Sequence, residues 1–485
     1  QLRLGHLNTL PYNLPYDKEF RRDLPFYVFY KIPISYFNSK ICGKGNIYYA
    51  FQNNEIINNL SFNKLRNDEC IVLNKKYKKF YLIGYSINKK NNLQISLKPN
   101  LKIKVLNLFN VFAIILLFFY FLKSFFNFNK SKKDEAVVLF MSVISTLVII
   151  FFKDINILLG LRYFRGGADG LFHESQAFEI IKNIYFGNFI QGLRGGEDLY
   201  YFMPGLRYIL AINKIIFGET SYGYLTIGLF LPVFLYKLIK NISSKKIAFI
   251  SIISFLFIPI FENMGFGHFN YIGQIIRNHA ETLSITIIVF CLSFISDKNF
   301  VKKSNFINIF IFSVLLAISS LCRPNFFPTT SLIIIYLLFI FYKNNFYMII
   351  PLILGYSIIT LSLLHNLYFS EKFVLFTQSN VHFVFNEAFQ NLNLKNYNDS
   401  FFYKQFTKWN PIYNIHRIFI LLFILYFIIK LKNTKLIYLL FTCMVLQHLV
   451  LLITHPDSRY AYLAWLFTFL LLLNILSSTY LKKLK

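Results

Sequence analysis

The sequence predicts an all-α polytopic membrane protein of about eleven transmembrane helices, preceded by a small β-rich domain outside the cytoplasm. Hydrophobic residues make up 55% of the 485 positions and the mean hydropathy is +0.48, which exceeds what a soluble core of this length needs. Apolar runs of spanning length recur along the chain and are separated by short lysine-rich tracts. In the first 100 residues, short runs of aromatic and β-branched residues occur instead of long apolar runs.

Residues 1–100 are expected to form the β-rich extracytoplasmic domain. Runs such as Phe26–Tyr30 and Phe80–Tyr85 alternate there with breaks containing Asn, Lys and Asp, which is typical of strands joined by turns. Cys42 and Cys70 lie in this segment and form either a disulfide in an oxidising compartment or two free thiols. The residues alone leave both alternatives open.

Residues 101–485 are expected to form the transmembrane domain. A helix needs about 20 residues to cross a bilayer, and the apolar segments approach this length. The chain begins at Gln1 rather than Met, so a helix or signal segment upstream is one expectation. The predicted spans lie near residues 105–122, 136–152, 222–240, 246–261, 279–296, 305–321, 328–342, 347–366, 415–430, 435–454 and 460–480.

Lysine clusters mark every second connection between these spans, which predicts that those connections face the cytoplasm. The net charge of +29 then follows from topology and gives no sign of a nucleic-acid partner. The remaining connections, including 153–221, 262–278 and 367–414, are expected on the extracytoplasmic or periplasmic face of a plasma (inner) membrane. The clusters lie at Lys123 to Lys133, Lys237 to Lys246, Lys298 to Lys303, Lys343, Lys430 to Lys435 and Lys482 to Lys485.

The loop 153–221 carries the most polar chemistry. Its stretch from Arg162 to Glu174 contains two arginines, a Gly-Gly pair, Asp169 and His173. If this stretch is helical, Asp169 and His173 share one side of the helix, and a carboxylate near the arginines stays ionised and able to accept a proton. Ordinary loop charges at a headgroup surface are the alternative, but so many Asp, Glu, His and Arg residues together favour a functional site.

Further polar groups follow on the predicted outer side, and they complete the set of candidate substrate-binding residues. Several are arginines at helix ends, where a single Arg is often only an anchor at the headgroups. Arginines that converge with carboxylates instead suggest an anionic lipid, because guanidinium binds phosphate in a bidentate fork. The candidates are Arg165, His173, Glu174, Glu197, Asp198, Tyr208, Arg277, Glu281, Arg323, His455, Asp457, Arg459 and Tyr460.

The order of these motifs resembles the GT-C membrane glycosyltransferases. In that superfamily the first large external loop carries a catalytic Asp soon after a transmembrane helix, a role that Asp169 matches. The pattern Pro204-Gly205-x-x-Tyr208, an Arg-Pro at Arg323 and an Arg-Tyr at Arg459 are also similar to the superfamily. The match covers roughly residues 105–480 but departs from the usual Asp-Glu pair, because Gly follows Asp169.

The resemblance implies transfer of a sugar from a polyprenyl-phosphate donor to a glycan, lipid or protein acceptor, with inversion. Asp169 would act as the general base, with Glu174 as the alternative, and Arg277, Arg323 and Arg459 would hold the departing phosphate. Some relatives use a divalent metal, and these carboxylates could bind one, although no spacing requires it. A flippase or transporter of lipid-linked saccharides and a polysaccharide polymerase or ligase are the alternatives.

Overall fold

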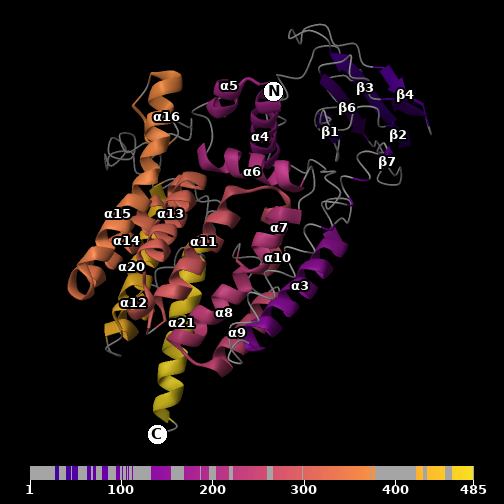
Figure 1. Cartoon of the computed structure of the whole chain (residues 1–485). Helices are drawn as coiled ribbons and strands as arrows, with labels where there is room; N and C mark the ends of the chain where they lie inside the picture. Colours follow the sequence, from indigo (N-terminus) through magenta and orange to yellow (C-terminus); the bar gives the residue numbers. More distant parts are fainter. Residues whose placement is uncertain are drawn as a thin grey trace, which may run out of the picture. The chain divides into compact units, whose positions relative to one another are not determined.

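The computed structural model is mostly helical (Figure 1). It describes residues 28–31, 40–44, 46–52, 63–66, 69–72, 79–85, 94–98, 101, 105, 108, 112, 133–153, 169–185, 187–195, 204–217, 222–258, 266–297, 299–371, 373–376, 422–429, 434–453 and 461–483.

The chain divides into two compact units, each considered separately below. The first contains residues 1–127, 154–187 and 210–223, and the second contains residues 128–153, 188–209 and 224–485. Helix α6 (Pro204–Phe217) therefore contributes residues to both units.

The first unit contains the described strands. They form a four-stranded antiparallel sheet in the order β1-β6-β3-β4 and a three-stranded one in the order β5-β2-β7. Cys42 lies opposite Cys70 in the register of β2 and β5, and the two form a disulfide, which settles the choice left open by the sequence. The strands are β1 (Val28–Lys31), β2 (Lys40–Lys44), β3 (Asn46–Gln52), β4 (Asn63–Leu65), β5 (Cys70–Val72), β6 (Lys79–Tyr85) and β7 (Gln94–Lys98).

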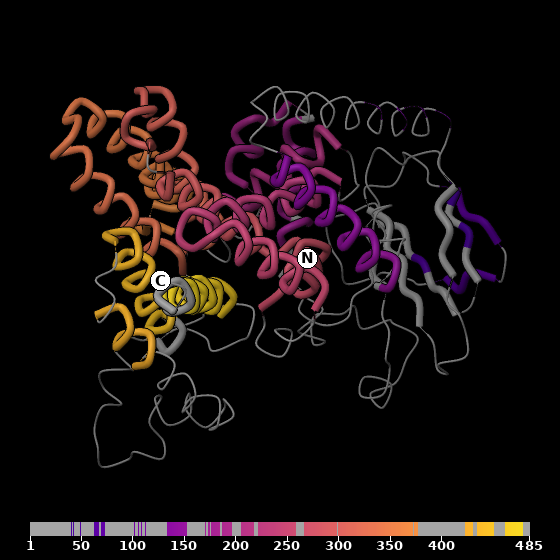
Figure 2. Tube along the Cα trace, turned by 90° about the horizontal axis from the view of Figure 1, so that it is seen from below, coloured from indigo at the N-terminus to yellow at the C-terminus, as the bar shows by residue number. Residues whose placement is uncertain are grey.

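The second unit is a bundle of apolar helices. Figure 2 shows its last helix end-on, beside the helix that precedes it. Among the described residues, the helices of both units include α3 (Lys133–Lys153), α4 (Asp169–Tyr185), α5 (Phe189–Arg194), α6, α7 (Tyr222–Leu229), α8 (Leu231–Ile242), α9 (Lys245–Phe257), α10 (His268–Ile276), α11 (Ala280–Ile295), α12 (Phe300–Lys303), α13 (Phe306–Cys322), α14 (Phe327–Asn344), α15 (Ile349–Tyr356), α16 (Thr360–Ser370), α20 (Lys435–Ile453) and α21 (Tyr462–Lys483), with short 3-10 turns η7 (Pro324–Phe326), η8 (Phe346–Met348) and η9 (Ser357–Ile359).

Four described helical segments are long and apolar enough to cross a membrane, which confirms the class of protein. They are Lys133–Phe152, Tyr222–Ile242, Pro324–Asn344 and Phe346–Ser370, and each coincides with a predicted span. Shorter apolar helices occupy four more predicted spans, at Ala280–Ile295, Phe306–Cys322, Lys435–Val450 and Tyr462–Ser478. The predicted span 105–122 lies largely outside the described residues and the span 415–430 is described only from 422 to 429, so the count of eleven stays a prediction.

Helix ends that were predicted to share a side of the membrane contact each other. At one end of the bundle, Asn241 of α8 donates a hydrogen bond to Ser296 after α11 (2.8 Å), and Lys245 of α9 pairs with Asp134 of α3 (2.8 Å). At other helix ends, Tyr224 of α7 donates to the His279 carbonyl before α11 (2.7 Å). The side of the membrane that each helix end faces stays a prediction.

Small residues hold the apolar helices close together. Ser284 of α11 and Ser319 of α13 each donate a hydrogen bond to the other's backbone carbonyl, at 2.9 and 3.2 Å. A Cβ atom at Gly355 of α15 would lie 2.6 Å from the Phe310 carbonyl oxygen of α13, so only glycine allows this approach. Such contacts are the usual way in which membrane helices associate, because lipid leaves little hydrophobic drive between them.

The segment 262–278, predicted as an external connection, is helical in most of its described part, and the side of the membrane that it faces stays a prediction. Its described part contains α10, whose residues from His268 to Ile276 are largely buried against α3, α9 and α11. The polar residues His268 and Gln274 of this segment are buried in the bundle. A short helix of this kind is tolerated at membrane depth where protein surrounds it.

Candidate functional site

Helix α4 begins at Asp169, which confirms that the stretch from Asp169 to His173 is helical. An acidic residue in the first turn of a helix interacts favourably with the positive end of the helix dipole. His173, one turn further on, is buried at 2% exposure. Arg165 and the Gly-Gly pair before Asp169 lie outside the described residues.

Glu174 has a different environment, because it is ion-paired. Its Oε1 lies 2.8 Å from Nζ of Lys214, which projects from α6, and both side chains are mostly buried. The pair therefore links α4 to the C-terminal half of α6 within the first unit.

Helix α6 has an inverted distribution of polarity. Its charged residues Arg207 and Lys214 are buried, whereas Ile212, Ile215 and Ile216 are exposed. In a water-soluble helix the reverse is expected. The exposed isoleucines form an apolar stripe along one side of α6.

Two sequence motifs meet where α5 ends. Gly195 adopts a left-handed conformation (φ +81°) after α5, and its carbonyl accepts a hydrogen bond from Nη1 of Arg207 (2.8 Å). A Cβ at this glycine would lie 2.7 Å from the Tyr208 hydroxyl, so a side chain is excluded by both strain and space. Arg207 and Tyr208 of α6 therefore hold Gly195 in place.

Tyr208 is anchored by its hydroxyl. The hydroxyl donates to the Leu193 carbonyl and lies 2.8 Å from Nε2 of His365 on α16. Burial raises the pKa of the Tyr208 hydroxyl to about 12, so it remains a donor at physiological pH. This places Tyr208 as a positioning residue between α5, α6 and α16.

Gly205 brings the start of α6 against the end of α13. A Cβ atom at Gly205 would lie 2.9 Å from the Leu321 carbonyl carbon and 3.0 Å from the Cys322 nitrogen. Both are backbone atoms, which cannot move aside cheaply. The Pro-Gly pair and the Arg-Pro pair, more than a hundred residues apart in sequence, are therefore neighbours in the second unit.

Arg323 and Glu281 form a buried ion pair beside this contact. Nη2 of Arg323 lies 3.2 Å from Oε1 of Glu281, and the side chains are 6% and 3% exposed. Thr282, next to Glu281, donates hydrogen bonds to the Tyr224 hydroxyl and to the His279 carbonyl. Charge at this depth is costly without partners, so these polar residues act together.

The remaining candidates are only partly located. Arg277 ends α10 and is exposed, in contrast to the buried Arg323. The predicted convergence of Arg277, Arg323 and Arg459 on one cavity stays a prediction. Outside the described residues lie Glu197, Asp198, His455, Asp457, Arg459 and Tyr460.

Several residues in these contacts were not singled out from the sequence, notably Arg207, Lys214 and His365. A signal was present for two of them, since Arg207 and Lys214 are seven residues apart and so share one face of a helix. His365 gives no such signal, because it lies in an apolar span far from Tyr208 in sequence.

Within the described ranges, no group of three His, Cys, Asp or Glu side chains is placed to hold a metal ion. No family model, curated protein or solved structure matches the chain.

Proposed function

We propose that this protein is a membrane glycosyltransferase that transfers a sugar from a polyprenyl-phosphate donor to an extracytoplasmic acceptor. Asp169 takes the proton from the acceptor hydroxyl while polyprenyl phosphate leaves the anomeric carbon, which inverts its configuration. The observation that carries the proposal is that a helix starts at Asp169 in the polar loop between two membrane helices.

The contacts of Glu174 favour Asp169 as the base. Glu174 pairs with Lys214 at 2.8 Å and so ties α4 to α6, which assigns it a structural task. A general base must instead be free to receive a proton, directly or through one water. Glu174 therefore holds the helix that presents Asp169.

This proposal places the polar loop 153–221 at the membrane surface. The exposed isoleucines of α6 suit contact with lipid, while its buried cations face protein. Arg323, with Arg277 and Arg459, is assigned to the departing phosphate, where negative charge develops. Glu281 would hold the Arg323 guanidinium in a fixed orientation.

The distribution of charge also favours an enzyme over a transporter. In the described ranges, the buried charged side chains are Arg207, Lys214, Glu281 and Arg323, and all lie on α6 or at helix ends. A transporter places such groups near the middle of several spans.

The test measures release of polyprenyl phosphate from a panel of polyprenyl-phosphate sugars by the purified full-length protein. Asp169→Asn keeps the shape but removes the base, so turnover should fall by about 100-fold to 10,000-fold. Glu174→Gln is the matched control and should lower thermal stability while the folded fraction keeps most of its turnover.

If Glu174→Gln is inactive while Asp169→Asn turns over normally, the base lies one helical turn further on. If no donor of the panel is consumed by the wild-type protein, the class of reaction is wrong.

A further inference from the structure

Two helices of the second unit, α14 and α20, lie side by side (Figure 1). Near one end of the pair, Gln447 of α20 donates a hydrogen bond to the Thr329 hydroxyl of α14 (2.6 Å). At the other end, Nζ of Lys343 lies 4.5 Å from the centre of the Phe339 ring, and Nζ of Lys435 lies 5.5 Å from the same point. Two cations therefore converge on one ring where α14 ends and α20 begins.

Neither helix supplies a carboxylate to balance these two charges. Residues 298–370 and 400–456, which contain both helices, include no Asp or Glu. The same holds for the described elements against which α14 and α20 mainly pack, namely α13, α15, η7, η8 and α21. An aromatic ring attracts an ammonium group but does not cancel its charge, so the two lysines still repel each other. An anion bound between them would remove this repulsion.

The surface around the two lysines is apolar and exposed. About half of Phe339 is exposed (49%), and Ile335, one turn before it on α14, is exposed as well. On α20, Tyr438 lies one turn after Lys435 and is also exposed. Helix α14 belongs to a segment long and apolar enough to span a membrane, so exposed apolar side chains on it contact lipid. Lysines at the ends of such helices lie at the depth of the lipid head groups.

These features together select a lipid with a negatively charged head group. The phosphate oxygens of such a lipid accept charge-assisted hydrogen bonds from both ammonium groups, while its acyl chains lie on Phe339 and Ile335. A soluble phosphate would use the lysines but leave the exposed apolar surface of α14 without a function. A zwitterionic lipid carries a cation of its own beside the phosphate, and this cation is repelled by the two lysines.

We propose that the junction of α14 and α20 binds an anionic phospholipid, with its phosphate between Lys343 and Lys435 and its acyl chains along α14. The lysine clusters predict that these helix ends face the cytoplasm, and anionic lipids are concentrated in that leaflet. Neither lysine takes part in the proposed sugar transfer.

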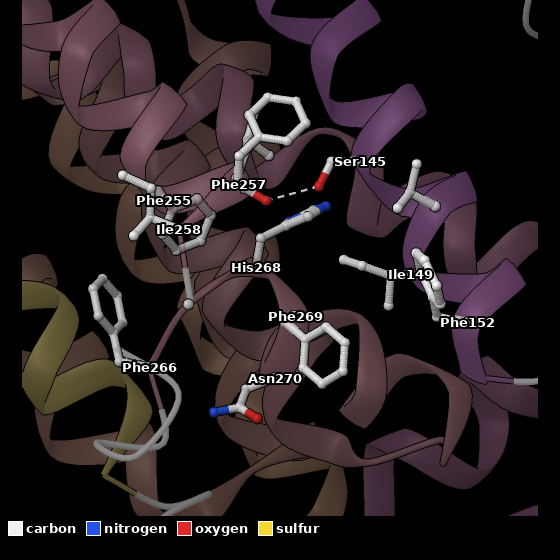
Figure 3. Close-up of a pocket in the computed structure, with 13 residues that line it drawn as sticks. Ser145, Ile149, Phe152, Phe255, Phe257, Ile258, Phe266, His268, Phe269 and Asn270 are labelled. Carbon is white, nitrogen blue, oxygen red and sulfur yellow. Dashed lines mark hydrogen bonds between the residues drawn. The ribbon is translucent and has the colours of Figure 1, made fainter. Parts of the chain in front are cut away.

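An apolar pocket of the same unit provides an internal comparison. It has a volume of about 320 Å³ and lies between α3, α9 and α10, with Ile149, Phe255 and Phe269 in its walls (Figure 3). No charged side chain occurs among the described residues that line it. A lipid chain held there gains nothing from a negative head group. Selectivity for anionic lipid therefore reports binding at the two lysines.

The test uses the full-length protein in neutral detergent micelles and a photoreactive diazirine analogue of phosphatidylglycerol. Mass spectrometry should locate a label on α14 or α20 near Phe339. Unlabelled phosphatidylglycerol should displace this label at a concentration about fivefold or more below that of phosphatidylcholine with the same chains, because each basic residue near an anionic lipid contributes on this scale.

Lysine variants show whether the two cations act together. Lys343→Gln and Lys435→Gln should each weaken binding about fivefold and the double variant about 25-fold. Lys435→Arg keeps the charge and should bind normally. The matched control is Lys302→Gln with Lys303→Gln, which removes the same charge from α12, where Lys303 pairs with Asp297 at 3.4 Å. This control should bind as the wild type does. All four lysines are exposed, so each variant should fold.

Equal displacement by phosphatidylglycerol and phosphatidylcholine in the wild-type protein would overturn the proposal. So would an equal loss of binding in the control variant, because binding would then follow from overall charge alone. Displacement by inorganic phosphate at the same concentration would show that the acyl chains contribute nothing, and stronger displacement by polyprenyl phosphate would give the site to a different lipid. The proposal fails in either case. None of these results depends on whether the protein transfers a sugar.

Discussion

Arg323 and Glu281 lie 3.2 Å apart, N to O, at the ends of two apolar helices, and both side chains are buried. Arg323 follows α13 and Glu281 is in the first turn of α11, so the pair joins segments about forty residues apart in sequence. Such a pair is either a structural tie or part of a binding site for an anion, and substitutions can separate the two roles.

We expect Arg323→Ala and Glu281→Ala each to destabilise the protein by about 3–5 kcal/mol, because each leaves one uncompensated buried charge. The double variant Arg323→Met with Glu281→Leu should recover most of that stability, since an apolar pair of similar volume is often neutral. Thermal unfolding in detergent measures this. If the stable double variant still consumes a polyprenyl-phosphate sugar normally, the pair has a structural role alone.

Gly205→Ala is expected to destabilise the protein by about 1–3 kcal/mol, because the new Cβ would meet the backbone of Leu321 and Cys322. Alanine normally stabilises a helix relative to glycine by up to about 1 kcal/mol, so the sign of the change is diagnostic. Ile215→Ala, on the exposed face of the same helix, is the control and should change the unfolding temperature little. A stabilising Gly205→Ala would show that α6 and α13 are not in backbone contact.

Tyr208→Phe should cost about 0.5–1.5 kcal/mol, since it removes the hydroxyl donor to the Leu193 carbonyl and leaves that carbonyl with Nε2 of His365, 2.9 Å away, as its partner. The contribution should also depend on pH. The pKa of Tyr208 is raised to about 12 in the folded state, whereas an unfolded tyrosine ionises near pH 10. The stabilisation is therefore fully present below about pH 10 and is lost as the pH rises toward 12. Unfolding of wild type and Tyr208→Phe at pH 9 and pH 11 measures it, and a constant difference between the two proteins would contradict the assignment.

The orientation can be checked with an impermeant thiol reagent on intact cells. A cysteine at Asn188, which is exposed at the start of α5, should react from outside. One at Lys246, exposed at the start of α9, should react only after the membrane is opened. The background is low because Cys42 and Cys70 are bonded and Cys291, Cys322 and Cys443 are buried. The opposite pattern would reverse the orientation and remove the external site.

Hydropathy predicted where most described helices lie, because a run of apolar residues long enough to cross a membrane has few alternatives. It did not predict α10, a short helix inside a segment that was expected to be an external connection. Polar side chains can be buried if the surrounding helices cover them, and a sequence does not state which helices those are. The partners of Tyr208 and Glu281 could not be predicted for the same reason. His365 and Arg323 are distant from them in sequence and contact them only in the packed bundle.

The residues just before α10 are held by α21. Phe266 packs its ring on Tyr462 and Phe469 of α21, and the Tyr462 hydroxyl donates to the Gly267 carbonyl, directly before His268. Helix α21 follows α3, α9 and α10 in the chain, so it leaves the ribosome after them. The start of α10 therefore acquires these contacts only after α21 has been synthesised. A nascent chain halted before Tyr462 would contain α3, α9 and α10 but would lack the side chains that hold the start of α10 in place.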